Sequence, residues 1–187
     1  MVYKRVILKR GKEESLKRFH PWVFSGAIAR MDNIEEGDLV TVYDHEGNLI
    51  GNGHYQIGIG MYQIGSIAVR ILTFDDTEID SAFFVKRLTE AFKMRQALGL
   101  NRPDNNAFRL VHGEGDFLPG LVVDIYGSTA VMQAHSPGMH FARNLIADAL
   151  TQLPNGVVKN VYYKSETTLP YKAQLDPQNE YIVGEYD

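Results

Sequence analysis

Five short runs of β-branched and aromatic residues fill the first 75 residues, and clusters of turn-forming residues separate them. The runs are residues 6–9, 22–28, 39–43, 49–55 and 67–72, with turn clusters at Gly11, Gly26, 36–38 and 44–48. Short strands with Gly- and Asp-containing turns between them are typical of small barrels. The pattern therefore predicts a small β-barrel, and residues 39–55 predict a hairpin with a loop of three to five residues.

A polar cluster at residues 75–77 ends the last of these strands and marks a domain boundary near residue 75. Asp80 is a candidate helix N-cap, and Gly99 is a candidate terminator. Between them, apolar residues recur at helical spacing: Phe84, Leu88, Ala91, Phe92 and Leu98. We expect this helix to bridge two modules, residues 1–75 and residues 76–187.

The second module has an α+β pattern. Strands are predicted at residues 109–112, 121–126, 129–135, 157–164 and 181–185, with a turn at 113–120. Ser136 and Pro137 supply the N-cap and first residue of a helix. Its apolar face is Met139, Ala142, Ile146, Ala149 and Leu150. We predict a strand-strand-helix-strand-strand domain with one helix against a sheet, so the chain belongs to the α+β class.

Composition excludes several classes of protein. The chain is 44% apolar and 22% charged, which is the balance of a folded globular protein. No run approaches the roughly 18 apolar residues of a membrane span, and the N-terminus is too charged for a signal peptide, so we expect a cytoplasmic protein. The absence of cysteine excludes disulfides, thiolate metal sites and a cysteine nucleophile within these residues.

Positive charge is concentrated at the N-terminus. Residues 1–30 hold eight Lys and Arg against two Glu, a net +6, whereas the whole chain carries −4. Such a segment predicts a local phosphate-binding surface, and the alternative is an ordinary solvated face. The residues that could make such contacts are Lys9, Arg10, Lys12, Lys17, Arg18 and His20.

Aromatic residues follow the basic run directly. Trp22 and Phe24 stand beside Arg and Lys, an arrangement that can stack on exposed bases while cations hold phosphates. The alternative, which we favour for these two side chains, is that they belong to the barrel core.

A second polar cluster lies in the turn at residues 113–120 and its flanks. His112, Glu114, Asp116 and Asp124 resemble an acid/base or metal-binding set, and a small hydrolase using the three carboxylates is one interpretation. Gly113, Gly115, Pro119 and Gly120 are typical of tight turns. We therefore expect the carboxylates to accept hydrogen bonds from backbone amides, with no catalytic residue.

Other motifs give weaker signals. The six histidines show no metal-binding spacing, so no metal is predicted. Gly51–Gly53 and Gly58–Gly60 do not continue into a phosphate-binding loop, so no cofactor site is expected in this chain. The sequence Tyr-Gln-Ile-Gly occurs at Tyr55 and again at Tyr62.

Four segments together carry a resemblance to a known family. They are residues 18–28, 66–72, 80–88 and 109–124, the last reading Arg-Leu-Val-His-Gly-Glu-Gly-Asp-Phe-Leu-Pro-Gly-Leu-Val-Val-Asp. They resemble the bacterial SAM-dependent methyltransferases that modify cytosine C5 in large-subunit ribosomal RNA. That family has an N-terminal PUA domain, a central α+β domain and a C-terminal Rossmann-like catalytic domain.

The resemblance implies a PUA domain at residues 1–75 and the central domain at 76–187, with the catalytic domain absent. The family's cysteine nucleophile and glycine-rich S-adenosylmethionine loop match nothing here, and the repeated Tyr-Gln-Ile-Gly departs from its pattern. The implied function is the RNA-recognising portion of such an enzyme, inert alone, with ribosomal RNA as partner. S-adenosylmethionine is then the parent's cofactor. A free-standing structural or protein-binding module is the alternative, and homodimerisation stays open.

Overall fold

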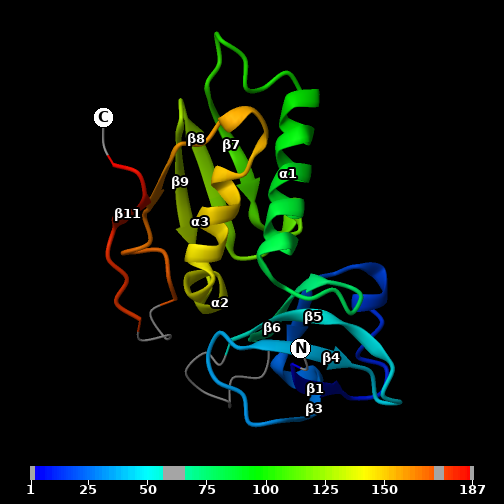
Figure 1. Cartoon of the computed structure of the whole chain (residues 1–187). Helices are drawn as coiled ribbons and strands as arrows, with labels where there is room; N and C mark the ends of the chain where they lie inside the picture. Colours follow the sequence, from blue (N-terminus) through cyan, green and yellow to red (C-terminus); the bar gives the residue numbers. More distant parts are fainter. Residues whose placement is uncertain (1–2, 57–65, 171–174, 186–187) are drawn as a thin grey trace. The chain divides into compact units, whose positions relative to one another are not determined.

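The structure is a computed structural model that describes residues 3–56, 66–170 and 175–185 (Figure 1). The chain divides into two compact units. The first is Met1–Ile79 with the short segments Ser136–Gly138 and Pro170–Gln174, and the second is the remainder. The second copy of the Tyr-Gln-Ile-Gly repeat, at Tyr62, lies outside the described residues, as do Gly58 and Gly60.

The first unit contains a six-stranded sheet that curls into a half-barrel, in the order β2-β6-β5-β4-β1-β3. Its strands are β1 (Lys4–Leu8), β2 (Trp22–Phe24), β3 (Ile28–Met31), β4 (Leu39–Tyr43), β5 (Leu49–Tyr55) and β6 (Ile67–Thr73). β1 pairs in parallel with β4 and antiparallel with β3. The first strand of the chain therefore lies inside the sheet rather than at its edge.

One face of this sheet forms the apolar core. Buried residues of three strands line it, among them Val6 and Leu8 on β1, Val40 and Val42 on β4, and Val69 on β6. Burial alternates along β1, as in a strand with one buried face, whereas on β4 Thr41 is buried together with its valine neighbours. The predicted bounds of β4 and β5 agree with the structure, and those of β1 and β6 differ by only one or two residues.

The predicted strand at residues 22–28 was wrong in extent. β2 ends at Phe24, a 3₁₀ turn spans Ser25–Ala27, and β3 begins at Ile28. β3 went unpredicted because Ala29, Arg30 and Met31 are exposed, so this edge strand has no alternation of buried and exposed positions.

Gly51 and Gly53 on β5 are required by packing against β6. A Cβ atom at either position would lie 2.1 Å from a backbone oxygen, that of Thr73 for Gly51 and that of Arg70 for Gly53. Glycine within a strand often marks such a close backbone approach. These two glycines therefore allow the close pairing of β5 with β6 and do not form a phosphate-binding loop.

The second unit contains a five-stranded sheet in the order β11-β10-β9-β8-β7. Its elements are α1 (Ser81–Ala97), β7 (Ala107–His112), β8 (Leu121–Tyr126), β9 (Thr129–Ala134), α2 (Pro137–Phe141), α3 (Arg143–Thr151), β10 (Asn160–Tyr163) and β11 (Glu180–Val183). β9 and β10 pair in parallel, and the other neighbours are antiparallel. The three strands predicted before the helical segment, at residues 109–112, 121–126 and 129–135, are present as β7, β8 and β9, so the strand-strand-helix-strand-strand order counted one strand too few. The helical segment itself breaks at Ala142.

α1 packs against α3 and β7 and belongs to the second unit, so two helices rather than the predicted one cover this sheet (Figure 1). The Asp80 carboxylate accepts a hydrogen bond from the Phe83 backbone N–H at 2.9 Å, which confirms the predicted N-cap. Leu98 was wrongly placed on the apolar face: it is 69% exposed, because it lies beyond the last turn of the helix.

Candidate nucleic-acid interface

A tight turn after β1 displays two of the predicted cations. The Lys12 backbone N–H donates to the Lys9 carbonyl oxygen at 3.1 Å, and Gly11 takes the left-handed conformation that this turn requires, with φ of 76°. Arg10 and Lys12 are exposed, and their side chains form no hydrogen bond or ion pair within the described part of the chain. Within the described residues, these two cationic side chains therefore take no part in holding the fold together.

The other predicted cations have internal partners. The Lys9 ammonium donates to the Gly26 carbonyl oxygen at 3.0 Å, and the Arg18 guanidinium donates to the Glu14 carbonyl oxygen at 3.2 Å. Lys17 lies 3.7 Å from the Glu13 carboxylate and 3.6 Å from that of Glu14. All three remain exposed at the surface, but the charge of Lys17 is largely offset by these two neighbours.

Acidic residues from later in the chain also offset the N-terminal charge. Lys4 pairs with Asp38 at 2.7 Å, and Arg5 pairs with Asp32 at 3.3 Å. The net charge of +6 for residues 1–30 therefore overstates the positive charge of the surface, because the β3–β4 connection places two carboxylates beside β1. The excess of positive charge is left around the turn at Arg10 and Lys12.

His20, Trp22 and Phe24 form a row of rings on and just before β2. The His20 and Trp22 rings meet edge to face at 5.2 Å between centroids, and those of Trp22 and Phe24 at 6.3 Å. Trp22 is half-buried and Phe24 is 41% exposed, so the prediction that these two lie in the barrel core was wrong. On an edge strand only three residues long, alternate side chains are left at the surface.

The aromatic row and the basic turn belong to one region of the first unit. Lys9 joins them, because its backbone N–H donates to the Ala27 carbonyl oxygen at 2.8 Å while its ammonium contacts Gly26. Both partners lie in the 3₁₀ turn that directly follows Phe24. Exposed rings beside exposed cations are the combination found in surfaces that bind unpaired bases and their phosphates.

Phe19 is a surface feature that sequence reasoning missed. It follows the 3₁₀ turn Leu16–Arg18 in a left-handed conformation with φ of 62°, and its side chain is 68% exposed. Its ring meets that of Phe74 edge to face, with 5.3 Å between centroids. A non-glycine residue with positive φ is uncommon, and the only sequence signal for it is position, immediately after the basic run.

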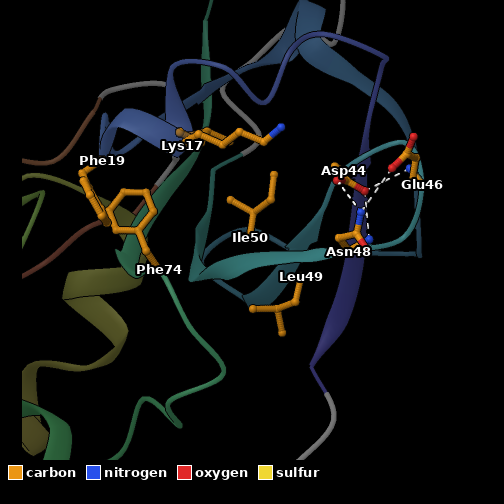
Figure 2. Close-up of a pocket in the computed structure, with 9 residues that line it drawn as sticks. Lys17, Phe19, Asp44, Glu46, Asn48, Leu49, Ile50 and Phe74 are labelled. Carbon is orange, nitrogen blue, oxygen red and sulfur yellow. Dashed lines mark hydrogen bonds between the residues drawn. The ribbon is translucent and has the colours of Figure 1, made fainter.

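A pocket of about 380 Å³ opens between these rings and the β4–β5 loop. Figure 2 shows Phe19 and Phe74 on one side, Asp44, Glu46 and Asn48 on the other, and Ile50 between them. Its lining is Leu16, Lys17, Phe19, Asp44, Glu46, Asn48, Leu49, Ile50 and Phe74. All nine residues belong to the first unit.

The polar wall of this pocket is a loop that Asp44 organises. The Asp44 carboxylate accepts from the backbone N–H groups of Glu46 and Asn48 at 2.9 and 2.8 Å, and from the Asn48 side-chain amide at 2.9 Å. The hydrogen bond from the Asn48 side chain lowers the pKa of Asp44 below its usual value. Asp44 is therefore ionised and fully occupied in holding the loop.

In the cluster around the turn at residues 113–120, the predicted backbone hydrogen bond is confirmed for Asp116, whereas arginine side chains hold both Asp116 and Asp124. The Asp116 carboxylate accepts from the His112 backbone N–H at 2.7 Å and from the Arg95 guanidinium at 2.8 and 2.7 Å. Asp124 instead receives two hydrogen bonds from Arg109, at 2.8 and 3.0 Å. Two of the three carboxylates that a hydrolase would need are thus each held by a different arginine.

Neither a metal centre nor a membrane span is found among the described residues. They contain no group of three or more His, Cys, Asp or Glu side chains placed to hold a metal ion. They also contain no helix of the length and apolarity that crossing a membrane requires.

The first unit is similar to a known family of domains. A family model for a PUA-like domain matches residues 6–74, which span β1 to β6. This part of the chain is similar to PUA-like domains. The half-barrel sheet, the basic turn and the pocket all lie within or beside the matched residues.

Over its whole length the chain is homologous to proteins named ribosomal RNA large subunit methyltransferase I. It is 35% identical to the one from Escherichia coli (strain SMS-3-5 / SECEC), over 97% of this chain and 44% of that protein. It is 36% identical to the one from Klebsiella pneumoniae (strain 342), over 98% and 44% respectively. The chain therefore spans less than half the length of these curated relatives.

Solved structures share the fold. One, titled "A putative sam-dependent methyltransferase from Streptococcus mutans", superposes with a TM-score of 0.70 over 88% of this chain and 41% of that chain, at 18% identity. Another methyltransferase structure, whose title says that it is complexed with SAH, gives a TM-score of 0.71 over 88% and 40%, also at 18% identity. At this identity the likeness concerns the fold alone.

Proposed function

We propose that this chain is the RNA-recognising portion of a SAM-dependent ribosomal RNA (cytosine-5) methyltransferase and is catalytically inert by itself. The observation that carries the proposal is the display of Arg10 and Lys12, without internal partners among the described residues, beside exposed rings on a PUA-like domain. The homology to ribosomal RNA methyltransferases supports ribosomal RNA as the partner. Lys9, Lys17, Arg18 and His20 then border the contact made by these two cations.

The chemistry of methyl transfer belongs, in this proposal, to a catalytic domain of the parent enzyme. Residues 1–187 include no cysteine to attack the cytosine ring. Gly51 and Gly53 do not fit a cofactor loop, because backbone oxygens of β6 lie where their Cβ atoms would be. S-adenosylmethionine is therefore assigned to the parent, and the second unit acts as a spacer or as one wall of the substrate site.

RNA binding at two salt concentrations tests the proposal. The variant Arg10→Gln/Lys12→Gln removes two exposed cations, and Lys93→Gln/Lys159→Gln is the matched control, because both of its lysines are exposed on the second unit. We expect the first variant to bind a ribosomal RNA fragment several-fold more weakly. Its plot of log affinity against log salt should be shallower by about 0.7–0.9 for each phosphate that the variant no longer neutralises.

The control variant should bind like the wild type. An affinity that is indifferent to salt, to Arg10→Gln/Lys12→Gln and to neutralisation of Lys17 and Arg18 would refute the proposal. A pull-down in which RNase leaves a protein partner bound would instead favour the alternative of a protein-binding module.

A further inference from the structure

The pocket beside Phe19 has an aromatic and apolar half. Phe74 packs against the core of the first unit, and its ring supports that of Phe19 in an edge-to-face contact. Leu16, which is 2% exposed, and the half-buried Ile50 complete this half (Figure 2). A surface of this kind accepts the face of a flat ring, because the burial of aromatic and aliphatic side chains against the ring is favourable.

The opposite half supplies hydrogen-bond acceptors. Asp44 is occupied by the loop, so Glu46, whose side chain is 68% exposed, brings the carboxylate that a ligand can reach. The Asn48 amide nitrogen donates to Asp44 at 2.9 Å and to one Glu46 carboxylate oxygen at 3.5 Å, which leaves the Asn48 side-chain oxygen as a second acceptor. The pocket therefore suits a ring that carries N–H or amino donors on one edge.

The charge balance disfavours a phosphate inside the pocket. Two carboxylates, Asp44 and Glu46, line it, and the lining cation Lys17 lies within 3.7 Å of both Glu13 and Glu14. The Glu13 side chain is only 8% exposed, and its Oε2 atom has no partner among the described residues, so it adds further negative potential behind Lys17. A neutral ring is preferred to an anion under these conditions.

We propose that this pocket binds an unstacked nucleobase of the RNA, with the base between Phe74 and Glu46 and the flanking phosphates outside on Arg18, Arg10 and Lys12. The proposal rests on the proposed RNA-binding function of the chain. The volume of about 380 Å³ is near the lower end of the ~300–1,000 Å³ range of small-molecule sites, which suits one ring system with its sugar.

A cationic side chain of a protein partner is the competing occupant. It would also meet carboxylates, but the exposed cation Arg18 directly follows the lining residue Lys17 in the same 3₁₀ turn. An exposed cation beside the pocket and acceptors inside it match a strand that is anionic along its backbone and neutral at its bases. The arrangement therefore favours RNA over a basic peptide.

Two RNA hairpins that differ only by one bulged cytidine test the proposal with the full chain. Wild-type protein should bind the bulged hairpin about tenfold more tightly than the fully paired one, the range of one base–aromatic contact. A bulged 2-aminopurine in the same position should change its fluorescence on binding. Phe19→Ala removes an exposed ring, so the protein should stay folded by thermal unfolding and lose the preference for the bulge.

Glu46→Gln is the second variant, because it changes the acceptor without changing the shape of the pocket. It should narrow the preference for a bulged cytidine over a bulged uridine, since only cytidine presents an amino group. Lys12→Gln is the matched control: it should weaken binding of both hairpins by the same factor.

The outcomes separate the two proposals. If wild-type protein binds both hairpins equally, or if Phe19→Ala keeps the preference, the pocket proposal is wrong and the RNA-binding function stands. If neither hairpin binds, both are wrong. Chemical-shift changes at Ile50 and Phe74 on adding L-arginine amide but not cytidine would also overturn the pocket proposal, in favour of a protein side chain.

Discussion

Arg95 and Asp116 form a two-point ion pair that joins helix α1 to the turn after β7. The two hydrogen bonds are 2.8 and 2.7 Å long, and the side chains are only 12% and 2% exposed. The same guanidinium donates to the Arg109 carbonyl oxygen at 3.0 Å. One arginine thus connects the helix, the strand and the turn of the second unit.

Removing one partner of this pair should destabilise the second unit strongly. Arg95→Met leaves the buried Asp116 carboxylate without its cation, and breaking such a pair costs about 3–5 kcal/mol. The free energy of unfolding in urea measures the loss. Arg109→Met is the control, because Arg109 and Asp124 are 46% and 22% exposed and their pair should contribute below about 1 kcal/mol. Equal losses of unfolding free energy in the two variants would contradict the prediction that the buried Arg95–Asp116 pair matters more to stability than the exposed Arg109–Asp124 pair.

The close pairing of β5 with β6 predicts that β5 does not tolerate the addition of a single methyl group at its glycines. Gly53→Ala would place Cβ 2.1 Å from the Arg70 carbonyl oxygen, so the strands must separate, and overpacking of this kind costs roughly 1–3 kcal/mol. Gly115→Ala is the matched control, since nothing lies within 4 Å of the position its methyl group would take and its φ is not positive. The midpoint of thermal unfolding should fall for Gly53→Ala and stay or rise for Gly115→Ala.

His54 should make the first unit sensitive to acid. Burial, together with the charge of Arg70, lowers the pKa of His54 to about 4 from 6.5. As the pH is lowered, His54 binds a proton near pH 6.5 in the unfolded chain but only near pH 4 in the folded chain. The contribution of neutral His54 to the free energy of unfolding is therefore complete above pH 6.5. It is lost as the pH falls towards 4, by about 3 kcal/mol in total. His135 and His140 have pKa values shifted in the same direction.

Unfolding free energies of wild type and His54→Gln between pH 7.5 and 4.5 measure this contribution. The variant should show a clearly flatter profile over that interval, with the remaining slope coming from the other two histidines and, near pH 4.5, from carboxyl groups whose pKa the fold lowers. Parallel profiles would show that His54 is not protonated on unfolding.

Trp22 should report RNA binding through its fluorescence. It is the single tryptophan of the chain, half-buried, and in contact with His20 and Phe24. If the aromatic row lies in the interface, saturating RNA should quench or shift the emission along the same titration curve as filter binding. N-acetyltryptophanamide corrects for absorption by the RNA. Full binding without any change in emission would exclude the row from the interface.

Local patterns predicted those parts of the fold that depend on local physics. Runs of β-branched and aromatic residues marked β1, β4 and β6, and Asp80 marked the start of α1, because strand propensity and helix capping act over a few residues. β3 was missed because its side chains are exposed, and Leu98 was misplaced because helical periodicity does not show where a helix ends.

The features that no local pattern contains arise from contacts distant in sequence. Arg95 and Asp116 are 21 positions apart, and Asp38 meets Lys4 across 34. Asp38 and Asp32 pair with Lys4 and Arg5 on β1, so the N-terminal segment presents less positive charge than its own sequence predicts. The exposure of Phe24 followed from the edge position of β2, which only the sheet order reveals.

The interior position of β1 has a consequence for recognition. Because β3 and β4 flank it on both sides, the turn at Arg10 and Lys12 extends from the middle of a sheet and is not a loose N-terminal arm. A basic arm would lose conformational freedom on meeting a polyanion and would give up affinity in doing so. Here the turn that carries Arg10 and Lys12 is ordered when the chain folds, so binding a polyanion requires no further ordering of its backbone.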